Sequence, residues 1–316
     1  MNIIGTRRIW LSLSTILVAI CIISLFKPGL NAGIEYTGGT TIDIPLSRKI
    51  TASDVRKVID ESPVLSRMKL KAQVQPYSSV NPQTGKAEYG MKVRTRSLEV
   101  DDINTLLKEM GKSLSPKYGN SFNLEDVNYY GVEPVVGKEM VNKAIWAVIL
   151  STIGILVYVS FRFEFKSGVA AVLALIHDVF IVIGTAAILR IEVNGPFLAA
   201  VLTIVGYSIN DTIVVFDRIR ENLQFRKKGD TFEGLVNNAI IATLRRSIYT
   251  ALTTLLAILA LYVFVPTIRE FTGPMIVGLV AGTYSSIFIA SPVWVIWRNW
   301  TEKQHQKQVL TKKAKA

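Results

Sequence analysis

Six stretches of mostly apolar residues constrain this chain more than any other feature of its sequence. A membrane crossing needs about 20 such residues, because the hydrocarbon core is about 30 Å thick. Half of all residues are hydrophobic and only 19% are charged, which indicates an integral membrane protein and excludes a disordered chain. The six predicted spans are 9–26, 144–161, 169–189, 196–216, 248–265 and 271–297.

Cysteine and histidine are too scarce to build a metal centre. Cys21 is the one cysteine, so the chain forms no internal disulfide framework. The two histidines, His177 and His305, do not make a multi-histidine zinc site. We therefore predict no metal and no other cofactor.

The first apolar segment follows Arg7 and Arg8, so it shares the basic start of a secretory signal. A signal peptide is the alternative interpretation. The segment is long for a signal core, and no small-x-small cleavage site follows it. It is therefore predicted to be an uncleaved anchor.

The basic residues predict the topology. Residues 31–142 carry 15 Lys and Arg against 14 Asp and Glu, so nearly all of the net charge of +12 lies beside the apolar segments. Lys and Arg in short flanking loops mark the cytoplasmic side, and this explains the charge without a nucleic-acid partner. Both termini are predicted to be cytoplasmic, and the tail to lie near anionic lipid. The predicted domains are 1–27 (N-terminus and first span), 28–142 (extracytoplasmic), 143–297 (spans two to six, with a cytoplasmic loop at about 217–245) and 298–316 (basic tail).

The segment between the first two spans is long enough to fold alone. Strands are predicted where apolar and polar residues alternate, and helices where apolar residues recur with helical spacing. The resulting order is β-α-β-β-α-β, which predicts an α+β, ferredoxin-like domain. The predicted elements are strand 40–44, helix 52–62, strand 70–74, a turn at 78–82, strand 89–93, helix 100–110 and strand 121–127.

Ionisable residues inside the predicted spans are candidate functional groups, because each costs about 2.5–3.5 kcal/mol on insertion scales. Asp178 lies near the middle of the third span and follows His177. Asp211 lies in the fourth span beside Asn210, and Arg246 opens the fifth. We expect these groups to converge inside a helix bundle.

Low dielectric favours the neutral form of a carboxylic acid, and a nearby guanidinium favours the charged form. This competition suits a proton relay in which protonation moves helices. The alternative for Asp211 is a structural salt bridge to Arg246. The alternative interpretation of Asp178 is a purely structural polar group whose hydrogen bonds are satisfied by His177 or by a hydroxyl. A metal-binding role for His177 is disfavoured, since the membrane segments contain no second histidine.

Gly278 and Gly282 form a GxxxG pattern in the sixth segment, followed by Ser285 and Ser286. Small residues at this spacing allow close approach of another helix. Packing within the chain is the favoured interpretation, and packing against a partner of similar shape is the alternative.

Several motifs in this chain resemble those of the SecF family. Residues 33–40 read GIEYTGGT and resemble its G-[IV]-[DE]-[FY]-[TS]-G-G-T signature. Residues 206–222 read GYSINDTIVVFDRIREN and are similar to its fourth-span signature. The resemblance covers residues 33 to about 291 and includes LIHD at 175–178, LRRS at 244–247 and GTYSS at 282–286.

The resemblance implies a six-span bundle like one half of a resistance–nodulation–division (RND) transporter, in the cell inner membrane. It implies an accessory subunit of the Sec preprotein translocase, driven by the proton motive force, without covalent catalysis. Implied partners are a SecD-like subunit, a SecYEG-type channel, the preprotein, and YajC- and YidC-like proteins. Asp211 would be the proton-responsive acid, Arg246 its partner (Arg245 if the register shifts by one), and Asp178 a secondary member.

The resemblance also assigns a role to the Gly-Gly pair of the first signature. Gly38 and Gly39 would provide a tight backbone where the first span enters the external domain. That external domain would be the part of the chain that moves.

Two other functions remain as alternatives. An intramembrane aspartyl protease would use Asp178 and Asp211 as paired acids sharing a proton. The Gly-x-Gly-Asp signature of such proteases is missing at Asp211, which follows Asn210. Half of a small-molecule RND exporter would need a larger external domain.

Overall fold

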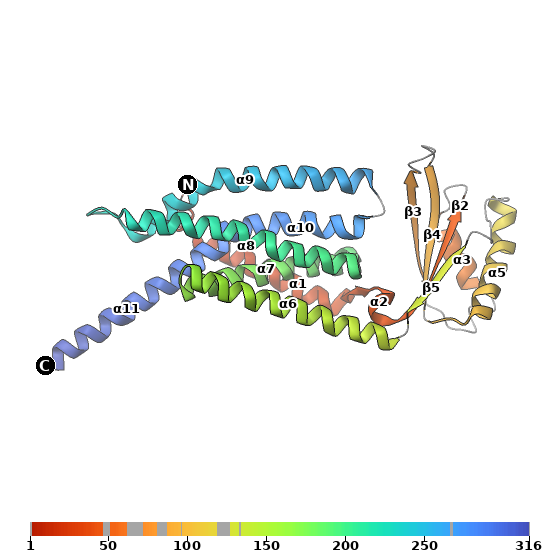
Figure 1. The fold of residues 1–316 in the computed structure, drawn as a ribbon, viewed down its shortest axis with the longest axis horizontal. Coiled ribbons are helices and arrows are strands. Elements are labelled where there is room, and N and C mark those ends of the chain that lie inside the picture. The colour runs from red at the N-terminus through yellow and green to blue at the C-terminus, as the bar shows by residue number, and fades with distance from the viewer. Residues whose placement is uncertain are drawn as a thin grey trace.

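The computed structural model describes residues 2–46, 51–61, 72–80, 87–95, 97–118, 127–132, 134–265 and 268–315. A bundle of long helices and a smaller α/β domain lie end to end (Figure 1). Both chain termini lie at the end of the bundle away from the α/β domain (Figure 1). We call this the termini end, and the opposite end the domain-facing end.

Among the described residues, six helical segments of the bundle are long and apolar enough to cross a membrane, which confirms the predicted number of spans. The last one is divided by a π-helical turn at Ser286–Ala290. The helices are α1 (Arg7–Ser24, followed by a π-helical turn at Leu25–Gly29), α6 (Pro134–Arg162), α7 (Phe165–Leu189), α8 (Gly195–Gln224), α9 (Phe232–Phe264), α10 (Arg269–Ser285) and α11 (Ser291–Lys315).

The helices extend beyond the apolar stretches that predict them. Residues 217–224 belong to α8 and 232–245 to α9, so the predicted loop at 217–245 shortens to 225–231. The Thr231 side chain caps α9 by accepting a hydrogen bond from the Gly234 amide. The predicted basic tail is helical through Lys315. Apolar content marks only the lipid-embedded part of a helix, whereas backbone hydrogen bonds continue into the polar region.

The α/β domain has a four-stranded antiparallel sheet with strand order β3-β4-β2-β5. Its helices lie on the side of the sheet away from the bundle (Figure 1). Side chains such as Ile42, Val93 and Leu106 form its separate core. The elements are β2 (Gly39–Leu46), α3 (Ala52–Glu61), β3 (Gln73–Val80), β4 (Ala87–Thr95), α5 (Val100–Tyr118) and β5 (Asn128–Val132).

The elements of this domain occur in the predicted order, but their ends differ. Ser78–Val80 pair with β4 as part of β3, so the turn predicted to start at Ser78 is wrong there. Helix α5 continues past Met110 to Tyr118. The last strand is β5 at Asn128–Val132; the predicted strand 121–127 lies outside the described residues except for Val127, which is not in a strand. Pairing with a neighbouring strand sets the ends of β3 and β5, and the local pattern of apolar residues carries no information about that pairing.

Short elements join the two parts of the chain. They are β1 (Asn31–Ala32), α2 (Ile34–Thr37) and β6 (Glu192–Val193), and β1 pairs with β6 in parallel. Gly38 and Gly39 follow α2 with φ of 71° and 145°. A Cβ on Gly39 would collide with the Thr95 carbonyl oxygen, so this close approach of β2 to β4 requires glycine.

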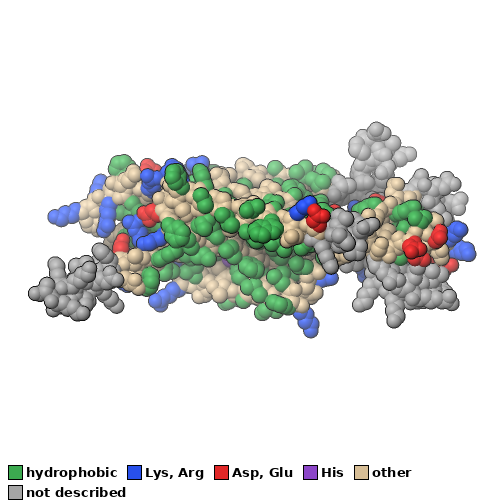
Figure 2. All heavy atoms as spheres, turned by 60° about the horizontal axis from the view of Figure 1, so that its bottom comes forward, with side chains coloured by type: hydrophobic (Ala, Val, Ile, Leu, Met, Phe, Trp, Pro, Cys, Tyr) green, Lys and Arg blue, Asp and Glu red, His purple; other side chains and the backbone are tan. Residues whose placement is uncertain are grey.

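The bundle surface is apolar along its length. Figure 2 shows hydrophobic side chains over its middle and Lys and Arg gathered toward the termini end. Helices α6 and α9 bury few of their residues, and Leu150, Val157 and Leu256 are among their exposed side chains. Such surface is stable against lipid or another apolar helix, as expected of a multi-pass membrane protein.

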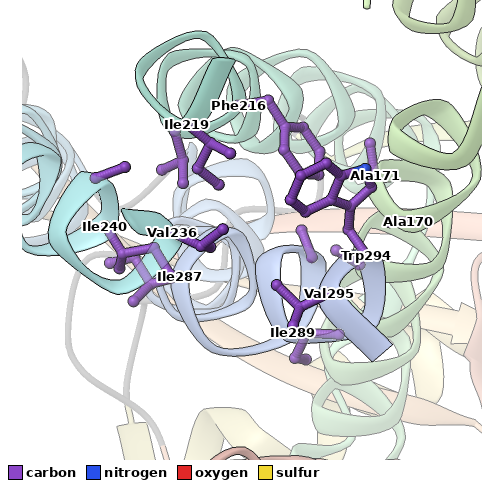
Figure 3. Packing of buried hydrophobic residues seen from close by; sticks show 14 of the residues in the cluster. Ala170, Ala171, Phe216, Ile219, Val236, Ile240, Ile287, Ile289, Trp294 and Val295 are labelled. Atoms are coloured by element: carbon purple, nitrogen blue, oxygen red, sulfur yellow. The ribbon is translucent and has the colours of Figure 1, made fainter. Parts of the chain in front are cut away.

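The largest core of the bundle lies where α7, α8, α9 and α11 meet. Figure 3 shows Phe216 of α8 and Trp294 of α11 at its centre, with Ala170 and Ala171 of α7 alongside. The two aromatic rings meet edge to face, with centroids 6.1 Å apart. Packing in this core holds the start of α11 in place, and the π-helical turn that leads into α11 is positioned with it.

The glycines of the GxxxG pattern pack α10 against α8 of the same chain. A Cβ on Gly278 would lie 2.2 Å from the Ile204 side chain, and one on Gly282 would lie 3.0 Å from Ser208. The interpretation as packing within the chain is therefore confirmed for these two positions.

We predict that Gly278→Ala lowers the free energy of unfolding by about 1–3 kcal/mol, because the added methyl group overpacks the contact with Ile204. Gly206→Ala on the same helix pair is the control, since a Cβ there meets nothing within 4 Å. Thermal denaturation of the protein in detergent measures both. Equal melting temperatures for the two variants would contradict the packing argument.

Candidate functional site

Two aspartates lie inside the bundle, and hydroxyl groups from neighbouring helices hold each of them. Asp178 of α7 is fully buried, with 0% of its surface exposed. Its Oδ2 accepts hydrogen bonds from Ser208 Oγ of α8 at 2.5 Å and from Ser285 Oγ of α10 at 2.7 Å. Its Oδ1 lies 3.0 Å from His177 Nδ1. Three helices therefore meet at this carboxyl group.

Asp211 of α8 is held in the same way and is 9% exposed. Its Oδ1 accepts a hydrogen bond from Ser247 Oγ of α9 at 2.9 Å, and its Oδ2 accepts one from Ser286 Oγ at 3.2 Å. This second carboxyl group therefore joins α8 to α9 and to the π-helical turn.

Ser285 and Ser286 connect the two carboxyl groups, since these consecutive residues contact one aspartate each. They lie where α10 passes into the π-helical turn. Ser291 Oγ donates to the Ser286 carbonyl at 3.3 Å across this turn. π-Helical turns inside α-helices are frequent at functional sites. Here two adjacent hydroxyls contact carboxyl groups that belong to two different helices, α7 and α8.

Hydroxyl partners suit a carboxyl group that changes protonation state. An ionised carboxylate only accepts hydrogen bonds, whereas the protonated acid also donates one. A serine hydroxyl both donates and accepts by rotating, so the same four serines can serve either state. A fixed cationic partner would not adapt in this way.

Three of the predicted site residues meet in this cluster: Asp178, His177 and Asp211. His177 Nε2 is buried and has no hydrogen-bond partner among the described residues. Its ring lies 6.1 Å from that of Tyr284, which is hydrogen-bonded to Ser14 of α1. His177 therefore extends the polar cluster toward α1.

Arg246 does not form the structural salt bridge with Asp211 that is the alternative interpretation. The ion pairs within 4 Å among the described residues do not include one between Arg246 and Asp211, although the guanidinium is near enough to interact electrostatically with the carboxylate. Arg246 is an exposed residue of α9, because Ser247 occupies the position that faces Asp211. Arg245, the alternative partner, packs its guanidinium over the Tyr249 ring at 5.4 Å.

Asn210 is not brought into the cluster either, since its side chain is exposed on α8. Its neighbour Asp211 faces the bundle interior, and adjacent helical residues point in different directions. The predicted relay role of Asn210 therefore has no contact with either aspartate to support it.

The hydroxyl donors are residues of the candidate site that the sequence analysis does not identify. Ser285 and Ser286 stand out there only as small residues after the glycines, and Ser247 only as part of the LRRS motif. The usable signal is the presence of hydroxyl side chains within apolar helices next to buried acids. Assigning each serine to one acid requires the packed structure.

A groove toward the termini end is lined in part by α8, the helix that carries Asp211. It has a volume of about 560 Å³ and lies over α8 between α6 and α9. Its lining includes Arg246 of α9, Tyr158 and Arg162 of α6, and Asp217 of α8. Arg162 and Asp217 form an ion pair across it at 3.3 Å.

The chain matches two family models. The model described as protein export membrane protein SecD/SecF, C-terminal, covers residues 113–300, and the SecD/SecF GG motif covers residues 23–50. Two named relatives are the protein translocase subunits SecF of Sebaldella termitidis and SecDF of Bacillus subtilis. The first is 35% identical over 98% of this chain and 95% of its own length, and the second 34% identical over 96% and 39%.

Solved structures agree with these matches. The crystal structure of SecDF from Thermus thermophilus superposes with a TM-score of 0.79 at 33% identity, covering 95% of this chain and 39% of that one. A SecDF structure in a super-membrane-facing form gives 0.69 at 32% identity, covering 98% and 40%. This chain therefore spans about two-fifths of each SecDF protein.

The fold and the buried cluster define a multi-pass membrane transport protein with hydroxyl-bound acids in its bundle. The chain belongs to the SecD/SecF family of protein export membrane proteins. Its role is accessory to protein translocation, which is a transport role.

We predict that Ser285→Ala lowers the free energy of unfolding by about 1–3 kcal/mol, because it removes a donor from a buried acceptor. Ser208→Ala should cost a similar amount. The double variant should cost less than the sum, since Asp178 can bind a proton once both donors are gone. Denaturation in detergent at several pH values measures all three.

Thr203→Ala is the control, because this exposed α8 hydroxyl bonds only to the backbone oxygen of Ala199. Its effect should stay within about 0.5 kcal/mol. Strict additivity of the two serine variants would contradict the shared acceptor.

Proposed function

We propose that this chain is an accessory subunit of the Sec preprotein translocase that uses the proton motive force in late steps of export. The observation that carries the coupling is the pair of buried aspartates joined through Ser285 and Ser286. The energy source is the proton gradient, with no cofactor. Buried ionisable groups in a membrane protein are costly and are typical of ion pathways.

Asp211 is the proton-responsive acid in this proposal. When its carboxyl group binds a proton, an oxygen that accepted a hydrogen bond becomes a donor. Whichever of Ser247 of α9 and Ser286 faces that oxygen must then rotate or move to accept the hydrogen bond. The spacing of α8, α9 and α10 thereby depends on protonation. Arg246 favours the ionised form through its charge, and Asp178 with His177 is the secondary member.

The topology proposed is cytoplasmic for both termini and extracytoplasmic for the α/β domain. Both termini lie at one end of the bundle, as an even number of spans requires (Figure 1). Lys and Arg gather at that end (Figure 2), which fits the bias of cytoplasmic loops toward positive charge. The strand order β3-β4-β2-β5 supports a ferredoxin-like fold for the external domain.

A SecD-like six-span half is the proposed partner in the membrane, giving an RND-like pair. The SecDF relatives are longer chains of which this one matches about two-fifths. The groove over α8 between α6 and α9 is the surface proposed to receive that half. A SecYEG-type channel, the preprotein, and YajC- and YidC-like proteins are the further proposed partners.

We predict that Asp211→Asn abolishes the stimulation of preprotein translocation by an imposed proton gradient, because an amide cannot bind and release the proton. The assay uses inverted membrane vesicles, a Sec-dependent preprotein and the full complex. Asp230→Asn is the control, since this acid lies in the loop after α8, outside both the cluster and the groove, and its carboxylate accepts a hydrogen bond from the Lys227 amide.

A wild-type response to a sodium gradient but not to a proton gradient would assign the coupling to Na⁺. Equal proton stimulation of wild type and Asp211→Asn would refute the role of Asp211. Loss of peptide cleavage or of drug resistance, with export unchanged, would favour a protease or a small-molecule exporter.

A further inference from the structure

One arginine of the α/β domain is buried against acidic groups of the bundle. Arg94 of β4 is 9% exposed and forms an ion pair with Glu192 of β6. It forms a second, at 3.5 Å, with Glu270 in the first turn of α10. Its guanidinium also donates to Gln75 Oε1 of β3 at 3.0 Å. The planar guanidinium, with five N–H donors held in a rigid fork, is well suited to serve several oxygens at once.

Strand register places Arg94 on the side of the sheet that faces the bundle. Its neighbour Val93 points into the domain core, and side chains alternate along a strand. Arg94 lies directly opposite Thr41 of β2, which is 0% exposed and adjacent to the core residue Ile42. Arg94 and Thr41 therefore share the covered face between domain and bundle.

The bundle half of this contact lies at the domain-facing ends of α8 and α10. Asn194 caps α8 by accepting a hydrogen bond from the Phe197 amide at 3.0 Å. The same side chain donates through Nδ2 to Glu270 Oε2 at 2.5 Å. The acid that pairs with Arg94 thus also joins the start of α8 to the start of α10.

These two helices carry the groups around the buried aspartates. Ser208 and Asp211 lie on α8, and Ser285 and Ser286 lie on α10 and at the start of its π-helical turn. Because an α-helix is stiff along its axis, a shift of α8 against α10 at the aspartates also alters the Asn194–Glu270 contact. One of the two Arg94 ion pairs depends directly on the position of Glu270.

We propose that Arg94 is a positioning residue that couples the state of the buried aspartates to the seating of the α/β domain on the bundle. In the present arrangement of α8 and α10 the carboxylates of Glu192 and Glu270 hold Arg94, and the domain is seated. A shift between the two helices separates these acids from Arg94 and releases the domain. A buried ion pair suits such a switch because losing one partner leaves an uncompensated charge. The proposal rests on the proposed function for what drives the shift.

Cysteine labelling at Thr41 tests the proposal. The full chain, in its complex and in membrane vesicles, carries Thr41→Cys and Cys21→Ala and is treated with a water-soluble maleimide. We expect slow labelling in this background and labelling at least about fivefold faster with Arg94→Gln. Arg94→Lys should fall between them. Arg56→Gln is the control, since this exposed α3 residue lines the same cleft of about 650 Å³ as Glu192 and Glu270.

The coupling itself is measured by repeating the labelling with Asp178→Asn and Asp211→Asn, each with and without Arg94→Gln. We expect the aspartate variants to change the labelling rate only when Arg94 is present. Equal changes in both backgrounds, or none in either, overturn the proposal, because a merely structural arginine would give those results.

A charge-free variant covers the case in which Arg94→Gln does not fold. Arg94→Gln combined with Glu192→Gln and Glu270→Gln leaves no buried charge unpaired, and it should label fast and without response to the aspartates. Slow labelling of this variant overturns the proposal. Labelling does not require export, so intact coupling in a chain whose export ignores the proton gradient refutes the proposed function and not the role of Arg94.

Discussion

The hydrogen bonds from Ser285 and Ser286 to two different aspartates depend on how closely α10 approaches α8. A serine hydroxyl reaches only one bond beyond Cβ, so helices at ordinary separation would leave these acids without donors. Gly278 and Gly282 remove the side chains that would hold the helices apart, since a Cβ on either would meet α8. The glycines and serines of this segment therefore act together: the glycines allow α10 to pack closely on α8, and this brings the serine hydroxyls within reach of the buried acids.

The same helix pair is joined again at its domain-facing end. Glu270 begins α10 and accepts a hydrogen bond from Asn194, which caps α8. Between these points the helices pack through Ile204 and Leu279, both fully buried. Close-packed interiors transmit displacement because they have few voids to absorb it. A change at the aspartates thus reaches the α/β domain through packed side chains, over the length of two helices.

The amino-acid sequence is sufficient to predict a property that depends on a single segment of the chain. Apolar length predicts the six spans, and the cost of charge in lipid singles out Asp178 and Asp211. Prediction fails where a property depends on two segments. Arg246 is adjacent to Ser247, and only the rotation of α9 decides which of them faces Asp211. Glu192, Glu270 and Arg94 are ordinary charges in sequence, because their separate elements meet only in the folded chain.

The exposure of Arg246 has a further consequence for the bundle. Arg246 lies at the same depth along the bundle as Asp211, because the next residue, Ser247, contacts the Asp211 carboxylate. On the facing helix, Asn210 is exposed one turn before Ile213 and Val214, which line the groove that also contains Arg246. A guanidinium and an amide facing hydrocarbon at this depth are costly, so such groups normally face protein or water. This face of the bundle is therefore better suited to a second membrane half than to lipid, and the helix that carries Asp211 contributes to it.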